Sequence, residues 1–258
     1  MENGLTRRRV IVLGASNVSL GLSMVVDLIR AGFSGPLQID IGDGHGRSYG
    51  AWTSIPFRAL PGHVDSKIWH PPESASDQQF ALMTDIGNDL IYDASVEQIS
   101  QWVRTCAERL VEQNAWLVMT RLPLGSIATL GRARYLFFRS IFFPACRISL
   151  DEIRSRALQL NEEVLGIAED VGATVVEPEN SWYGLDPIHI RQSDRQRAWG
   201  TMMMHWPDWQ GEAEVVRSSI SRRIELLRAK PRDYRSWGRF RESTSSIRLG
   251  DNAEIRFY

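Results

Sequence analysis

The segment Val10-Ile11-Val12-Leu13-Gly14-Ala15-Ser16-Asn17 joins a short apolar run to a glycine and a serine. A continuous apolar run that ends at a glycine is typical of a strand buried on both faces of a sheet. Helical periodicity follows over residues 20–29, and Gly32 lies just past the end of that helix. Ser16 is therefore expected on a turn that leads from a buried strand into a helix.

The rest of the chain repeats this alternation of strands and helices. Further strands are predicted at residues 37–41, 80–86, 115–120 and 174–176. The capping boxes Ser95-x-x-Gln98 and Ser149-x-x-Glu152 predict helices that run to about Glu112 and to near Gly172. Alternating strands and helices imply a parallel sheet with helices on both faces. The predicted fold class is α/β, with three α/β/α layers and a mainly parallel sheet of about five strands.

The composition is that of a soluble globular protein, with 43% hydrophobic and 24% charged residues. The length of 258 residues fits one α/β domain. The formal net charge is -1, so no whole-molecule field favours nucleic acid or an anionic membrane as a partner. The two cysteines make no disulfide framework, and the five histidines show no paired-ligand spacing, so no metal site is expected.

The N-terminal Arg7-Arg8-Arg9 and the apolar run after it look like a short signal peptide. The apolar run is too short for such a peptide, and no small-residue cleavage site follows it. No apolar run is long enough to cross a bilayer. The sequence therefore predicts a cytoplasmic protein with no membrane span.

Polar residues follow the predicted strands at the sheet edge where ligands of parallel α/β folds bind. A serine hydroxyl such as that of Ser16 is a weak nucleophile unless a base takes its proton. Asp186-Pro187-Ile188-His189 supplies a base, because a three-residue spacing lets the carboxylate reach the imidazole Nδ1–H. Acyl transfer also needs donors to an oxyanion, which the loop around Gly46 and the side chain of Asn88 can offer.

In this order the residues resemble the motif blocks of the SGNH (GDSL-like) hydrolase family, whose sheet is also flavodoxin-like. The resemblance covers roughly residues 9–200, from Gly14-Ala15-Ser16-Asn17 through Gly46-Arg47-Ser48 and Gly87-Asn88-Asp89 to Asp186-x-x-His189. Two positions depart from the pattern. Ala15 replaces the usual acidic residue before the serine, and no residue separates Gly87 from Asn88.

The resemblance implies a role for each matching residue. Ser16 would be the nucleophile, His189 the base and Asp186 the residue that orients it. The backbone N–H of Ser16, Gly46 and the Asn88 side chain would donate to the oxyanion. Within the glycine-rich loop, Gly42, Gly44 and Gly50 compete with Gly46 for that role.

The implied activity is that of a serine esterase, which hydrolyses acyl or acetyl esters of carboxylic acids through an acyl-serine intermediate. The resemblance implies no cofactor and no metal, and a small-molecule ester as the substrate. The family also contains thioesterases, lysophospholipases, carbohydrate deacetylases and acyl transferases. The sequence does not choose among them, because pocket shape decides the substrate.

Two other functions are compatible with parts of the sequence. A strand, Gly14 and the later Asp40 are reminiscent of a dinucleotide-binding oxidoreductase. That fingerprint needs closely spaced glycines, and the next glycine here is Gly21. A non-hydrolytic binding protein on the same fold is the second alternative, although Ser16, Asp186 and His189 are all present.

Two segments have no assigned role. Residues 136–143 hold four phenylalanines and predict either a helix packed on the core or a wall or lid of the acyl site. Residues 1–210 are assigned to the hydrolase domain. Residues 211–258 predict a helix to about Arg228 and an arginine- and aromatic-rich tail, which belongs to the same domain or forms an arm of a homo-oligomer. The near-neutral net charge argues against nucleic acid as the ligand of this tail.

Overall fold

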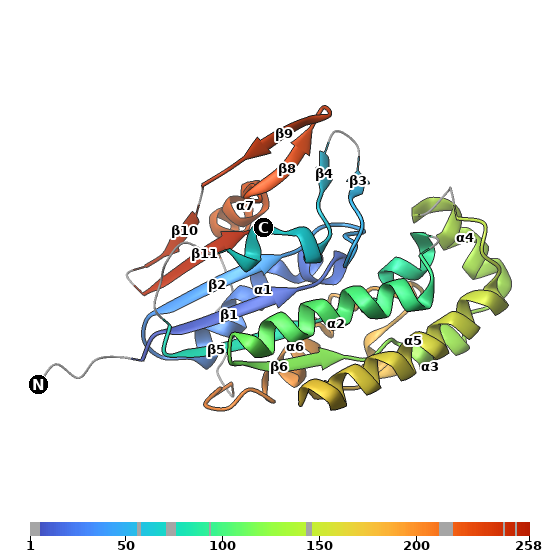
Figure 1. Cartoon of the computed structure of the whole chain (residues 1–258), viewed down its shortest axis with the longest axis horizontal. Coiled ribbons are helices and arrows are strands. Elements are labelled where there is room, and N and C mark those ends of the chain that lie inside the picture. The colour runs from blue at the N-terminus through green and yellow to red at the C-terminus, as the bar shows by residue number, and fades with distance from the viewer. Residues whose placement is uncertain are drawn as a thin grey trace, which may run out of the picture.

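The centre of the protein is a twisted, mainly parallel sheet (Figure 1). The computed structural model describes residues 6–55, 58–70, 76–92, 94–142, 146–211, 219–244, 246–250 and 252–258. The sheet has seven strands in the order β10-β11-β2-β1-β5-β6-β7. The predicted α/β class with a mainly parallel sheet is confirmed.

The middle of this sheet contains the strands that the sequence predicts. They are β1 (Arg8–Leu13), β2 (Leu37–Gly42), β5 (Gln78–Met83), β6 (Ala115–Thr120) and β7 (Thr174–Val176), all parallel to their neighbours. The third predicted strand ends earlier than expected, at Met83 rather than Ile86. Asp85 adopts a left-handed conformation with φ 59°, and Ile86 already belongs to the 3-10 helix η3 (Ile86–Tyr92).

The C-terminal segment adds two strands that the sequence analysis did not predict. The first, β11 (Ala253–Phe257), pairs in parallel with β2, and β10 (Ser246–Leu249) pairs with β11 in antiparallel fashion. A second, four-stranded sheet consists of β3 (Thr53–Ile55), β4 (Arg58–Leu60), β8 (Asp233–Ser236) and β9 (Arg239–Glu242). The predicted helix after Gly211 is present as α7 (Ile220–Arg228), and residues 212–218 lie outside the described part of the chain.

Helices cover both faces of the main sheet (Figure 1). The helices α1 (Ser16–Gly32), α6 (Arg195–Met203) and α7 lie on one face, and α2 (Val96–Glu112) and α5 (Leu150–Val171) lie on the other. Because side chains alternate along a strand, Val10 and Val12 of β1 pack in the first core and Ile11 and Leu13 in the second. Complete burial of each such side chain contributes about 1.5–3 kcal/mol to folding.

Local signals fix the ends of the helices. Ser95 and Gln98 form the predicted capping box of α2, and Ser149 Oγ accepts from the backbone N–H of Glu152 at the start of α5. Gly172, with φ 69°, ends α5 in the left-handed conformation that glycine adopts without strain. Two short helices, α3 (Leu124–Ala128) and α4 (Arg132–Phe142), lie between β6 and α5.

Three further 3-10 helices complete the described elements: η1 (His63–Asp65), η2 (Lys67–Trp69) and η4 (Asn180–Trp182). Of the helices within the described residues, none combines the length and the apolar character needed to span a bilayer.

Candidate active site

The turn between β1 and α1 is held by the carboxylate of Asp85. Its Oδ2 accepts from the backbone N–H groups of Ala15 (2.8 Å) and Asn17 (3.1 Å). Its Oδ1 accepts from the side-chain Nδ2 of Asn17 at 2.7 Å. The residues on both sides of Ser16 are therefore bonded to one carboxylate, which fixes the position of the serine at the carboxyl end of the sheet.

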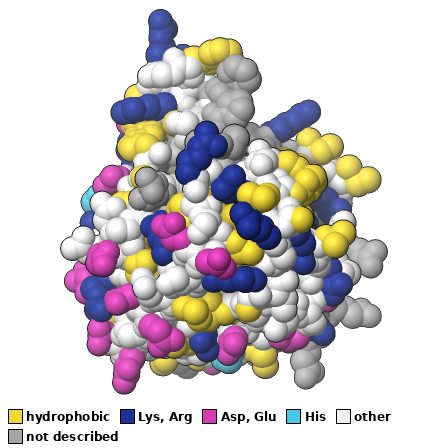
Figure 2. All heavy atoms as spheres, turned by 90° about the vertical axis from the view of Figure 1, so that its right-hand side faces the viewer, with side chains coloured by type: hydrophobic (Ala, Val, Ile, Leu, Met, Phe, Trp, Pro, Cys, Tyr) yellow, Lys and Arg dark blue, Asp and Glu magenta, His cyan; other side chains and the backbone are white. Residues whose placement is uncertain are grey.

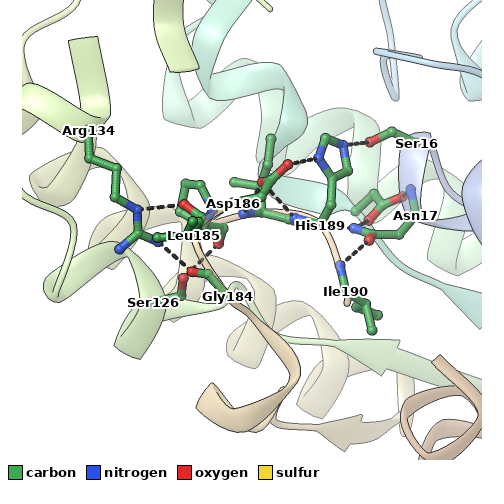
Figure 3. A network of polar contacts seen from close by, with 12 residues as sticks. Ser16, Asn17, Ser126, Arg134, Gly184, Leu185, Asp186, His189 and Ile190 are labelled. Carbon is green, nitrogen blue, oxygen red and sulfur yellow. Dashed lines mark hydrogen bonds and ion pairs between the residues drawn. The ribbon is translucent and has the colours of Figure 1, made fainter. Parts of the chain in front are cut away.

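The loop before α6 brings Asp186 and His189 to this serine (Figure 3). Asp186 Oδ2 lies 2.6 Å from His189 Nδ1, and His189 Nε2 lies 2.8 Å from Ser16 Oγ. Asp186 Oδ1 accepts from the backbone N–H groups of Ile188 (3.0 Å) and His189 (3.1 Å). The structure therefore brings all three predicted catalytic residues into one hydrogen-bonded chain.

The surroundings of Asp186 keep its carboxylate ionised. Burial raises the pKa of Asp186, but the hydrogen bond and charge of His189 and the two backbone N–H donors outweigh burial. The pKa of Asp186 therefore lies below its ordinary value. An ionised Asp186 accepts from Nδ1–H and leaves Nε2 to accept the proton of Ser16.

Asn17 connects the serine turn to the histidine loop (Figure 3). Its Nδ2 also donates to the carbonyl of Ile188 at 2.9 Å, and its Oδ1 accepts from the N–H of Ile190 at 2.8 Å. These are the two residues that flank His189. Asn17 belongs to the motif around Ser16, but no role was predicted for it. Its position next to Ser16 at a strand end was the available signal.

A pocket opens beside Ser16, and its lining is mainly apolar. The side chains come from η3, the segment after β6, and helices α3, α4 and α5, and include Leu90, Leu122, Ile127, Leu130, Phe138 and Ile153. Such a surface suits a hydrocarbon group rather than a charged one.

Of the predicted oxyanion donors, Ser16 and Asn88 line the pocket. The side-chain Nδ2 of Asn88 donates to the carbonyl of Arg47 at 3.0 Å, which anchors the amide. Gly46, with φ 69°, accepts the hydroxyl of Tyr92 at its carbonyl (2.9 Å). The structure does not bring the loop glycines to the pocket lining, as far as the chain is described; these are Gly42, Gly44, Gly46 and Gly50.

The wall of the pocket is fastened to the loop that carries Asp186 (Figure 3). Arg134 of α4 donates from Nε to the carbonyl of Leu185 (2.6 Å) and from Nη2 to that of Gly184 (2.7 Å). Ser126 of α3 donates to the carbonyl of Pro187 at 2.8 Å. These residues were not predicted, because a side chain that donates to a distant backbone carbonyl leaves no pattern in the sequence.

The phenylalanine-rich segment at residues 136–143 divides between two environments. Phe138 and Arg139 line the pocket, together with Tyr135 one residue before the segment. Leu136, Phe137 and Ile141 are exposed. The side chain of Phe142 and the whole of Phe143 lie outside the described residues.

Asp40, the acidic residue that the dinucleotide-binding alternative requires, already has hydrogen-bond partners within the protein. Asp40 is fully buried in β2, where Oδ2 accepts from Arg9 Nε at 2.6 Å and from Gln38 Nε2 at 2.8 Å. A carboxylate engaged in this way is not available to a ribose hydroxyl. The geometry gives this alternative no support.

Comparisons with known proteins agree with this fold. No protein-family model and no curated protein matches the sequence. A proposed arylesterase from Agrobacterium tumefaciens str. C58 is 13% identical, with a TM-score of 0.51 over 76% of this chain and 97% of that chain. A carbohydrate acetylesterase family member from Sinorhizobium meliloti is 14% identical, with a TM-score of 0.50 over 76% of this chain and 95% of that chain. The chain therefore has the fold of the SGNH (GDSL-like) hydrolases.

Proposed function

We propose that the protein is a serine esterase that hydrolyses carboxylic esters through an acyl-serine intermediate. The observation that supports this most directly is the double contact of His189, 2.8 Å from Nε2 to Ser16 Oγ and 2.6 Å from Nδ1 to Asp186 Oδ2. Nucleophile, base and orienting group in this relation are the requirement for activating a serine hydroxyl.

The proposed reaction has two steps. Ser16 Oγ attacks the ester carbonyl carbon while its proton passes to His189 Nε2, and the C–O bond to the alcohol breaks as His189 returns that proton to the leaving oxygen. Water then attacks the acyl-serine, His189 accepts a proton from the water, and the Ser16 oxygen takes it back as the acid leaves. Each step passes through an oxyanion, for which the N–H of Ser16 and the amide of Asn88 are the proposed donors. Gly46 is proposed as a third donor on the resemblance alone.

The apolar pocket supports a hydrocarbon acyl group as the part of the substrate that is recognised. Leu130, Phe138 and Ile153 line it beyond Ser16. We therefore propose medium or long acyl esters as better substrates than acetyl esters. Each methylene that leaves water on binding contributes about 0.8 kcal/mol.

A cytoplasmic location stays a prediction from the sequence.

A panel of p-nitrophenyl esters of graded acyl length tests this function, with wild type and Ser16→Ala measured side by side. Ser16→Ala should lose activity on every ester and should no longer react with a fluorophosphonate. Ser155→Ala, at an exposed serine of α5, is the matched control and should behave as wild type. Full esterase activity in Ser16→Ala would overturn the proposal. A folded wild type that neither hydrolyses nor is labelled would favour the binding-protein alternative.

A further inference from the structure

Helix α4 has an outer face that is more apolar than a water-facing helix requires. Leu136 is 40% exposed, Phe137 59% and Ile141 55%. With 3.6 residues per turn, these three positions fall within one arc of about 140° on the helix, and Tyr135 and Phe138, which line the pocket, lie outside that arc. Leu185, in the loop to which α4 is fastened, is 83% exposed. We call Leu136, Phe137, Ile141 and Leu185 the outer apolar face.

The same part of the chain is strongly cationic. Residues 121–150 contain five arginines and no aspartate or glutamate, although the whole chain has a net charge of -1. Among the described residues, Arg121 is the one of these five that forms an ion pair, with Glu177. Arg134 and Arg139 bond to backbone carbonyls, and Arg132 and Arg147 are exposed. Their charges are therefore not cancelled by partner carboxylates in this part of the structure.

The side of the molecule on which α4 lies faces the viewer in Figure 2. Hydrophobic side chains and Lys and Arg side chains gather in the upper right part of this view, and acidic side chains concentrate in the lower and left parts. Apolar and cationic groups thus occur together on one side of the protein. An amphipathic helix with this composition has the properties of segments that lie in a lipid–water interface.

We propose that the outer apolar face and the arginines around it dock the protein on an anionic phospholipid surface. Docked in this way, α4 would lie in the plane of the surface with Phe137 and Ile141 among the acyl chains. Phe137 also packs edge-to-face on Phe138, with ring centroids 5.3 Å apart, so the docking face adjoins the acyl pocket directly. A lipid ester would then reach Ser16 without first crossing water.

Charge favours a lipid surface over a second copy of this chain as the occupant. A two-fold dimer through α4 would place the same arginine-rich surface on both sides of the contact, so like charges would face one another. An anionic headgroup layer instead attracts each exposed arginine by about 1 kcal/mol, a factor of roughly five in binding.

Co-sedimentation of the full chain with vesicles tests the docking. The probe is unilamellar phosphatidylcholine, with or without phosphatidylglycerol, at low and high salt. Wild type should bind the anionic vesicles and release at high salt. Leu136→Ser/Ile141→Ser should bind about tenfold more weakly. Arg132→Glu changes the charge by two units and should bind about 25-fold more weakly. Phe137 is left unchanged because its ring supports Phe138.

Helix α7 provides the matched control. Ile224→Ser/Leu227→Ser removes apolar side chains that are at least as exposed, from an arginine-bearing helix that packs beside α1 and away from the pocket. This variant should bind like wild type. Hydrolysis of a water-soluble acetyl ester should be unchanged in the α4 variants, which excludes misfolding. The inference is overturned if Leu136→Ser/Ile141→Ser binds the vesicles as tightly as wild type. It is also overturned if the main effect of this variant is a change in oligomeric state.

The delivery of a lipid ester rests on the proposed esterase function, whereas vesicle binding does not. Ser16→Ala should bind anionic vesicles as wild type does while hydrolysing nothing. If the protein is an active esterase but does not bind the vesicles, the docking surface is refuted. A vesicle-binding protein with no hydrolysis refutes the proposed function and leaves the docking surface standing.

Discussion

Asn17 is predicted to position His189 rather than to touch the reacting atoms. Its side-chain amide donates to Asp85 Oδ1 and to the Ile188 carbonyl, and it accepts from the Ile190 N–H. Among the described hydrogen bonds, no other residue replaces these three contacts. Asn17→Ala removes all three and leaves a buried N–H at Ile190. Asn17→Asp preserves the shape and the acceptor for Ile190 but turns the donor into a carboxylate that faces Asp85.

The size of the effect follows from these bonds. A neutral hydrogen bond contributes about 0.5–1.5 kcal/mol and one to a charged group about 1.5–3 kcal/mol, so the loss of one charged and two neutral bonds in Asn17→Ala should lower the free energy of unfolding by about 2.5–6 kcal/mol. A displacement of the catalytic base by about 1 Å typically costs about 10²-fold in rate. We therefore expect kcat on a short ester to fall by about 10²-fold.

The assay is steady-state hydrolysis of a short-chain ester at a temperature where circular dichroism shows every variant to be folded. The loss should appear in kcat, with KM changed by less than about threefold, because the interaction acts on the transition state. Asn17→Asp should be worse than Asn17→Ala at neutral pH, and its kcat relative to that of wild type at the same pH should rise as pH falls. Protonation there turns the new carboxyl group into a donor to Asp85 again. A kcat for Asn17→Ala within threefold of wild type, or a loss confined to KM, would refute the positioning role.

Three further predictions concern single side chains. Asn88→Ala should lower kcat by about 10²–10³-fold if its amide binds the oxyanion, while the free energy of unfolding falls by only about 0.5–1.5 kcal/mol through the lost bond to the Arg47 carbonyl; a normal kcat would exclude the oxyanion role. Phe138→Ala should lower kcat/KM for long acyl esters by about tenfold and spare acetyl esters, with Leu136→Ala as the control; a flat chain-length profile would remove Phe138 from the acyl site. Burial raises the pKa of Asp89 to about 6, against hydrogen bonds from Ser48 and Tyr49. The folded state therefore holds this proton more tightly than the unfolded state, and stability declines as pH rises from about 4 to 6. Asp89→Asn should accordingly be more stable than wild type above pH 6, by up to about 3 kcal/mol, and show no advantage below about pH 4 in urea titrations.

The parallel strands and main helices could be predicted because their signals are local. The apolar run Val10–Leu13 needs no distant partner to be recognised, and Ser95 and Gln98 bond within their own helix turn. The strand β11 has no such signal. It is short, it carries Glu254 and Arg256, and it becomes a strand only by pairing with β2, more than two hundred residues earlier in the chain.

The candidate site could be predicted where chemistry and strand ends coincide. Ser16, Asp186 and His189 have the residue types that acyl transfer requires, in the order of the family that the sequence resembles, and the sheet edge accounts for their meeting. Asp85 was placed inside the third predicted strand, where a side chain would alternate between the faces of the sheet. The left-handed turn at this residue points its carboxylate at the Ser16 turn instead, and an isolated sequence does not reveal such a turn.

The loop that carries Asp186 and His189 has little regular structure, so its geometry depends on the contacts around it. Asp186 bonds to the backbone of its own loop and to His189, which means that the Asp–His pair forms locally. An antiparallel β-bridge between Tyr183 and Ile190 joins the two ends of this loop. The contact of His189 with Ser16 is different, because it joins segments 173 residues apart and is held by Asn17 on one side and by the Arg134 and Ser126 contacts on the other. Those same two residues belong to the helices that wall the acyl pocket. The positions of His189 and of the pocket wall are therefore set by one connected group of hydrogen bonds. In the proposed mechanism, this is a physical reason for acyl fit and proton transfer to depend on each other.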